Sequence, residues 1–211
     1  MGDIRPRAGR ENESMGFVLR FTLVTLTALA LSGTAHAAGG SYTFEGGTGK
    51  ERAQVRAALE ASAFPWDIVP AQITIHIARG NDSHALPGHI WLDADLLRSG
   101  RFAWGTVQHE YAHQVDFFLF DDATRARLLG ELGGRDWCYG VPGLDHADYG
   151  CERFASTLAW AYWPSADNAL EPESSRDESA ALAPAKFRSL LAELLGARSL
   201  TFAKRTTRAG G

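Results

Sequence analysis

The stretch TVQHEYAHQVDFF, residues 106–118, carries the pattern on which the fold of this 211-residue chain depends. Its apolar side chains recur every three or four residues, so we expect a helix over 102–118. His109 and His113 stand four residues apart and therefore share one helix face, with Glu110 beside them. Two such imidazoles can bind one metal ion, and the adjacent carboxylate can take a proton from a bound water. The pattern predicts a metal-dependent hydrolytic site.

A third protein ligand is needed, because a catalytic zinc ion takes three and keeps its fourth position for water. The extension HExxHxxGxxH is excluded, since Asp116 and Leu119 stand where it requires glycine and histidine. Glu152 follows in a predicted helix over 148–161, and two antiparallel helices with facing ligands would bring it to the histidines. We therefore expect Glu152 to be the third ligand. The alternatives are His146, Asp145, Asp148 and Asp116. Asp116 is also a candidate acceptor that orients a zinc-binding histidine.

Periodicity and turn residues predict the elements around this helix. The expected strands are 42–44, 73–77 and 89–93, with a loop over 80–88 between the last two. The expected helices are 50–63, a helix capped by Asp121 or Asp122 that runs to Leu132, 148–161 and 184–197. The result is a small α+β domain with a short sheet, and its C-terminal helix packs on the domain. We expect residues 164–183, which are acidic and rich in Ser and Ala, to form a flexible linker, and 198–211 to form a basic tail.

The N-terminal region has the layout of a secretory signal peptide. Arg20 precedes an apolar run over 21–31, and Ala35-His36-Ala37 supplies an A-x-A cleavage site. The run is too short to span a membrane, so we expect no stable membrane insertion after cleavage. Residues 1–14 are polar and charged, which favours Met15 as the translation start. We expect a signal peptide over 1–37, a mature domain over 38–163, and a secreted or cell-surface location.

The two cysteines flank the loop that leads to Glu152. Export places Cys138 and Cys151 in an oxidising compartment, so we expect a disulfide bond between them. This bond would fix the approach of Glu152 to the metal.

Composition excludes several classes of protein. Apolar residues make up 45% of the chain and charged residues 22%, values typical of a globular domain. The formal net charge of -4 disfavours nucleic-acid binding. We expect a monomer that acts on peptides.

Three segments resemble a minimal gluzincin zinc metallopeptidase. They are GHIWLDADLL (88–97), TVQHEYAHQVDFF (106–118) and CERFASTLAWAY (151–162). The E-x-F-A sequence that begins at Glu152 is similar to the third-ligand helix of the anthrax-lethal-factor-like catalytic domains. The resemblance covers roughly residues 70–163.

The resemblance implies a zincin-like domain with Zn²⁺ bound by His109, His113 and Glu152, and with Glu110 as general base. It also implies an edge strand ahead of the HExxH helix that binds substrate backbone, and by position this is His89–Asp93. Tyr149 is the first candidate to stabilise the oxyanion. His146 and Tyr139 are the alternatives.

Two departures from the family pattern concern catalysis. Many gluzincins place an acid one turn after the glutamate ligand, and this chain has Ser156 there. Asp145 stands where the related toxin domain has a tyrosine. Two other functions compete with a protein-cleaving peptidase: a secreted binding protein with a non-catalytic zinc site, and a hydrolase of cell-wall peptides. Glu110 favours an enzyme over a binding protein, because a non-catalytic site does not need it.

Overall fold

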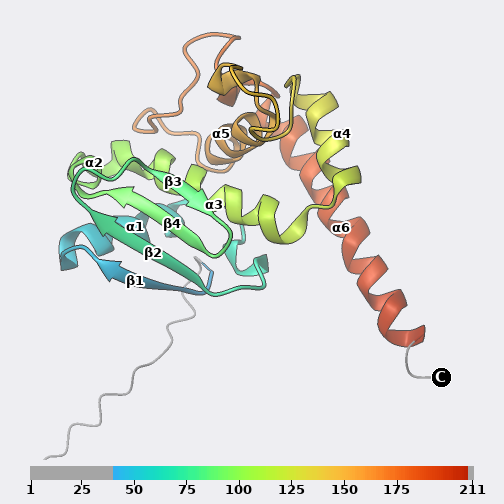
Figure 1. Cartoon of the computed structure of the whole chain (residues 1–211), viewed down its shortest axis with the longest axis horizontal. Coiled ribbons are helices and arrows are strands. Elements are labelled where there is room, and N and C mark those ends of the chain that lie inside the picture. Colours follow the sequence, from blue (N-terminus) through green and yellow to red (C-terminus); the bar gives the residue numbers. More distant parts are fainter. Residues whose placement is uncertain (1–39, 209–211) are drawn as a thin grey trace, which may run out of the picture. The chain divides into compact units, whose positions relative to one another are not determined.

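The computed structural model describes residues 40–208, with side chains as far as 196; the predicted signal peptide lies outside the described residues. The described part of the chain is mixed α+β and contains a four-stranded sheet in the order β1-β2-β4-β3 (Figure 1). The strands are β1 (Tyr42–Gly46), β2 (Ile73–Ala78), β3 (His84–Leu86) and β4 (His89–Asp93). Strands β1, β2 and β4 run parallel, and β3 runs antiparallel to β4. The α+β class with a short sheet is therefore confirmed.

The edge strands of the sheet are β1 and β3, so the prediction of His89–Asp93 as an edge strand is wrong. Strand β4 pairs with β2 on one side and with β3 on the other. Strand β3 lies within 80–88, which the sequence predicts as a loop. Pro87 and Gly88, the latter at φ 81°, form the tight turn that folds β3 back onto β4. Three residues are too few to show the alternation by which a strand is recognised.

The helices lie where the sequence pattern predicts them, except the four-residue α2, which it does not predict. They are α1 (Gly49–Ala61), α2 (Ala94–Leu97), α3 (Trp104–Leu119), α4 (Asp122–Leu132), α5 (Gly150–Tyr162) and α6 (Pro184–Arg208). Short 3-10 turns lie at Trp66–Ile68, Gly100–Ala103, His146–Asp148 and Glu178–Ala180. Asp121 caps α4 by accepting from the backbone N–H of Thr124, and Gly133 ends the helix at φ 78°. Helix α6 continues beyond its expected end at 197, through most of the predicted tail.

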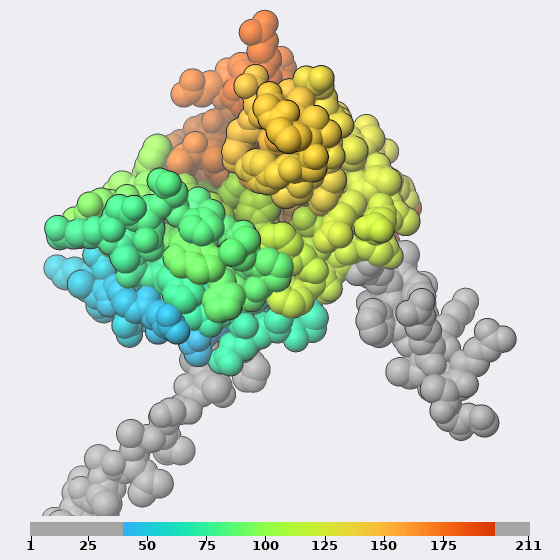
Figure 2. Space-filling model, in the orientation of Figure 1, coloured from blue at the N-terminus to red at the C-terminus, as the bar shows by residue number. Residues whose placement is uncertain are grey.

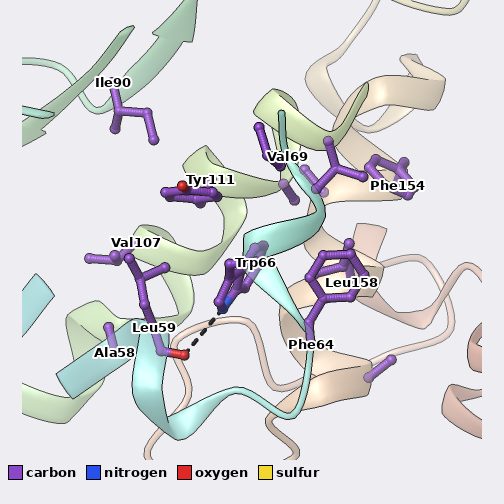
Figure 3. Close-up of a cluster of buried hydrophobic side chains, with 14 of the residues drawn as sticks. Ala58, Leu59, Phe64, Trp66, Val69, Ile90, Val107, Tyr111, Phe154 and Leu158 are labelled. Atoms are coloured by element: carbon purple, nitrogen blue, oxygen red, sulfur yellow. Dashed lines mark hydrogen bonds between the residues drawn. The ribbon is translucent and has the colours of Figure 1, made fainter. Parts of the chain in front are cut away.

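The core lies between the sheet and the helices (Figure 3). Alternate residues of β2 and β4 are buried, including Ile75 and Ile90, and the side chains between them face outward. Trp66 lies beneath Tyr111 of α3 and donates from its indole nitrogen to the Leu59 carbonyl at 3.1 Å. Phe154 and Leu158 of α5 belong to the same core. Helices α3 and α5 therefore share one apolar core, which holds their polar faces in a fixed relation.

Two buried glutamines attach α3 to its neighbours. The Gln108 side chain donates to the Ala58 carbonyl of α1 at 2.7 Å. The Gln114 side chain accepts from the Gly88 backbone N–H at 2.8 Å and donates to the carbonyls of Leu86 and His89 at 3.0 and 3.1 Å. Gln114 thus holds the β3–β4 turn against α3 and places the sheet edge beside the HExxH sequence.

Residues 164–183 pack on α5 and do not form the flexible linker that their composition predicts. Asn168 is buried and donates to the carbonyls of Ala159 and Trp163 at 3.3 and 3.0 Å. Ser179 is also buried, and the Glu178 carbonyl accepts from the Thr157 hydroxyl at 3.1 Å. Side-chain bonds to the ends and flank of α5, which composition does not reveal, order this segment.

The buried carboxylate of Asp116 joins three parts of the fold. It accepts from Arg125 of α4 at 2.8 Å and from the Trp137 indole at 3.0 Å. Arg125 also donates to the Asp116 backbone carbonyl at 3.2 Å. Asp116 therefore connects the end of α3 with α4 and with the loop that carries Cys138. The sequence suggested that Asp116 orients a zinc-binding histidine or binds the metal itself. These contacts agree with neither prediction.

We predict that Asp116→Ala destabilises the fold by about 3 kcal/mol, because it leaves the Arg125 charge without its buried partner. Urea unfolding in the presence of a chelator measures this without a contribution from metal. Asp122→Ala is the matched control, since Asp122 is fully exposed and lies 3.7 Å from the same arginine. The control should change stability by about 0.5 kcal/mol or less. Equal losses in the two variants would contradict the assignment.

Candidate metal centre

The HExxH sequence places three polar side chains on one buried face of α3. His109, Glu110 and His113 are each less than a tenth exposed. The Nε2 atoms of the two histidines lie 3.2 Å apart. Burying three ionisable groups on a helix costs free energy unless they pair with one another or with an ion. Their cluster is therefore a functional candidate.

Glu152, in the first turn of α5, completes the cluster from the facing helix. Its Oε2 atom lies 3.0 Å from His109 Nε2 and 3.3 Å from His113 Nε2. The three donor atoms thus form a small triangle. A tetrahedral ion with ligand bonds of about 2.0 to 2.1 Å separates its donors by about 3.3 Å. The spacing of these atoms fits a single ion.

Buried groups that could hold a metal ion are therefore present. The His109, Glu110 and His113 donor atoms form one such group, and those of His113, Cys151 and Glu152 form a second. The alternative ligands that the sequence offered, His146, Asp145, Asp148 and Asp116, belong to neither group. Asp148 instead pairs with Arg135 at 3.4 Å.

Burial and contacts with the histidines shift the pKa values of Glu152 and Glu110 in opposite directions. Burial alone would raise the pKa of Glu152, but hydrogen bonds and charge from His109 and His113 outweigh it and hold that pKa far below its ordinary value. At Glu110 burial dominates over the nearby histidines and raises the pKa. Glu152 therefore ionises more readily than an ordinary glutamate, which suits it to a cation, whereas Glu110 holds a proton more readily than an ordinary glutamate does.

Ser156 and Glu178 fix the orientation of His109. The Ser156 hydroxyl donates to Glu178 Oε2 at 2.9 Å, because a carboxylate can only accept. The same hydroxyl oxygen lies 3.0 Å from His109 Nδ1 and must accept from it. His109 then carries its proton on Nδ1 and turns the Nε2 lone pair toward Glu152, as metal binding requires. Glu178 therefore acts on His109 through the Ser156 hydroxyl.

Burial lowers the pKa of His109, but the hydrogen bond to Glu152 and the charge of Glu110 outweigh burial and raise it. A proton on Nε2 and a cation would therefore compete for the same place between His109 and Glu152.

His146 and Tyr139 also reach the cluster, whereas Tyr149 does not. His146 Nε2 lies 3.2 Å from Glu152 Oε2, and its Nδ1 lies 2.6 Å from Glu178 Oε1. The Tyr139 hydroxyl donates to Glu152 Oε1 at 2.9 Å. Tyr149 is buried and donates to the Val141 carbonyl at 2.8 Å. Its hydroxyl is thus bonded to the loop and not to Glu152, and the sequence could not distinguish it from Tyr139.

The backbone of Tyr139 is held in an unusual conformation. Its φ of 56° is the only positive value among non-glycine residues of the described chain. Cys138 forms a disulfide with Cys151, as expected, and the backbone N–H of Cys151 donates to the Trp137 carbonyl at 2.7 Å. Both bonds attach the residues just before Tyr139 to Cys151, and they maintain a backbone conformation that costs a bulky residue free energy. In this conformation the Tyr139 hydroxyl reaches the Glu152 carboxylate.

A cavity of about 310 Å³ opens beside the cluster. The gold 135–149 loop and the green β3–β4 hairpin flank it in Figure 2. Its lining is Ser83, His84, Ala85, Leu86, His109, Glu110, His113, Phe117, Cys138, Tyr139, His146 and Glu152. The cluster is therefore accessible to a ligand, with the sheet edge as one wall. Sequence reasoning missed β3 and Glu178; the one available signal for Glu178 was the missing acid at Ser156.

Comparisons of the chain with protein-family models, curated proteins and solved structures find no match. The assignment of the cluster consequently rests on its geometry and its donor types.

We predict that the purified full chain binds one divalent transition-metal ion and that Glu152→Ala abolishes stoichiometric binding, since two histidines remain. Dialysis against buffered metal followed by elemental analysis measures the content. Glu173→Ala, which removes an exposed glutamate of the 164–183 segment, should bind like the unchanged chain. Undiminished binding by Glu152→Ala would remove Glu152 from the site.

Proposed function

We propose that the chain is an exported zinc-dependent peptidase of the gluzincin type. The observation that supports this most directly is the triangle of His109, His113 and Glu152 donor atoms at 3.0 to 3.3 Å. Glu110 lies beside this triangle and lines the same accessible cavity. A site that only stored or transported a metal would not need this second buried carboxylate.

The donor set favours zinc over other common cations. Two imidazole nitrogens and one carboxylate oxygen are typical ligands of a catalytic zinc ion, which keeps one further position open. Calcium and magnesium prefer ligand sets made of oxygen atoms. The position left open faces the cavity in this proposal, where a water and a substrate carbonyl would meet.

Glu110 is the general base of the proposed reaction. A bound zinc ion would lower the pKa of a water toward about 7 and polarise the carbonyl of a peptide bond. Glu110 then accepts the proton of that water and passes it to the departing amine. The raised pKa of this carboxyl suits the first step, because it makes the carboxylate a stronger base than an ordinary glutamate.

Tyr139 and His146 replace Tyr149 as the groups proposed to stabilise the oxyanion. Both line the cavity and contact Glu152, so both lie within reach of a carbonyl oxygen bound near the cluster. His146 is held by Glu178 on its other nitrogen, which fixes the ring. Positioned donors of this kind act where negative charge develops.

We propose that a peptide substrate adds to the sheet at β3. Leu86 and His89 flank the two-residue turn and exchange hydrogen bonds, so the next pair, Ala85 and Ile90, does not. The backbone N–H and C=O of Ala85 therefore point to the free edge, where they can pair with an extended peptide. Ala85 also lines the cavity, which would place the peptide beside Glu110.

Export is supported by the signal-like N-terminus and is compatible with the disulfide. Within the described residues, no helix has the length and apolar character needed to cross a membrane.

We predict that Glu110→Gln retains bound zinc but loses hydrolysis by a factor of roughly 100 or more, because the shape is kept and the base is removed. Mass spectrometry of a mixed peptide library incubated with the zinc-loaded chain detects new termini. Hydrolysis by the unchanged chain together with equal hydrolysis by Glu110→Gln would refute the mechanism. Stoichiometric zinc without any hydrolysis by the unchanged chain would favour the binding-protein alternative.

Glu178→Gln should weaken zinc binding by roughly 10- to 100-fold, since an amide cannot hold both Ser156 and His146 as the carboxylate does. Competition with a chromophoric chelator measures the affinity. Ser156→Ala should have a similar effect, and the double variant should lose little more than either single variant, because both act through His109. Glu173→Gln, on the same segment, serves as control. Independent, additive losses would show that Ser156 and Glu178 do not act in series.

A further inference from the structure

Cys151 lies within reach of the proposed zinc ligands. Its Sγ atom is 3.7 Å from Glu152 Oε1, and Cys151, Glu152 and His113 offer ligand atoms that all lie within 4.8 Å of one another. The side chain is fully buried, so this sulfur is close to the cluster and shielded from solvent. The proposed reaction makes no use of it.

The oxidation state of Cys151 decides whether its sulfur can bind a metal. In the structure this sulfur is bonded to Cys138, whose side chain lines the cavity. A disulfide sulfur carries no negative charge and is a poor zinc ligand, whereas a thiolate is among the strongest. Breaking the bond would leave Cys151 free to rotate about its side-chain torsions toward the ion.

We propose that, in the reduced chain, Cys151 joins His109, His113 and Glu152 in a closed four-ligand zinc site. This inference rests on the proposed zinc site and deepens it. Four protein ligands are typical of structural zinc, and they leave no position for water. The reduced chain would therefore bind zinc more tightly and hydrolyse peptides poorly. The disulfide-bonded chain has the open, three-ligand site.

In an exported chain the reduced form comes first and the disulfide forms later. The chain is made where cysteines stay reduced and works where they are oxidised. Oxidation by an exported protein disulfide transfers two electrons to that disulfide, which leaves as two thiols. Cys138 supplies one of their protons and solvent supplies the other, because the zinc-bound Cys151 is already a thiolate. The Cys138–Cys151 bond forms as the zinc–sulfur bond breaks, and a water takes the vacated position.

A matched pair of variants tests the proposal, since each breaks the disulfide and only one keeps the proposed ligand. Cys138→Ala retains Cys151, whereas Cys151→Ala retains Cys138. Both full-length chains are loaded with Co²⁺, which reports a bound thiolate by a sulfur-to-cobalt charge-transfer band in the near ultraviolet. We expect the band in Cys138→Ala and its absence in Cys151→Ala and in the oxidised unchanged chain. Zinc affinity should be roughly tenfold or more tighter in Cys138→Ala than in Cys151→Ala.

The unchanged chain reduced by a phosphine provides a second reading that does not depend on either variant folding. It should gain the same band and lose it on reoxidation. Absence of the band from both reduced chain and Cys138→Ala, while cobalt is bound, would overturn the inference and leave the proposed peptidase intact. Failure of the oxidised chain to bind any metal would instead overturn the proposed function.

Discussion

The structure of the site depends on one constraint, which is that three buried donor atoms meet between α3 and α5. Donor atoms of His109, His113 and Glu152 lie within 3.3 Å of one another, on side chains that are each less than a tenth exposed. With His109 in the tautomer that Ser156 requires, a nitrogen lone pair and a carboxylate face each other, and only a proton or a cation between them makes this stable. The apolar core shared by the two helices supplies the free energy that keeps these groups together.

The surroundings of the cluster restrain it from several directions. Glu178 contacts both Ser156 and His146 with its two oxygens, so one carboxylate orients a proposed zinc ligand and a proposed oxyanion donor. Arg153 donates to the Leu132 and Ala147 carbonyls and fixes the start of α5. The Cys138–Cys151 bond does the same for the Tyr139 loop. Segments that composition predicts to be loops therefore hold several side chains of the site in position.

Elements with a strong period or a clear cap could be predicted from the sequence, and contacts between distant segments could not. Helix α4 was bounded correctly by its capping aspartate and final glycine. His109 and His113 could be predicted because helical spacing places them on one face of α3. Glu152 could be predicted because it begins a second apolar helix whose E-x-F-A sequence resembles that of a third-ligand helix. Strand β3 was missed because three residues show no period. Glu178 was missed because an acidic, Ser-rich segment has the composition of a linker, and its order comes from bonds to α5. The Tyr139 hydroxyl contacts Glu152 and the Tyr149 hydroxyl contacts Val141, and this difference depends on the conformation of the loop, which the sequence does not reveal.

The central claim is an open zinc site made by two histidines and one carboxylate, and X-ray absorption at the zinc edge of the oxidised, zinc-loaded chain tests it most directly. The account predicts four nitrogen or oxygen scatterers at about 2.0 to 2.1 Å, with the outer-shell pattern of two imidazoles and no sulfur. Three imidazoles, a sulfur at about 2.3 Å, or a shell of six oxygens would contradict it.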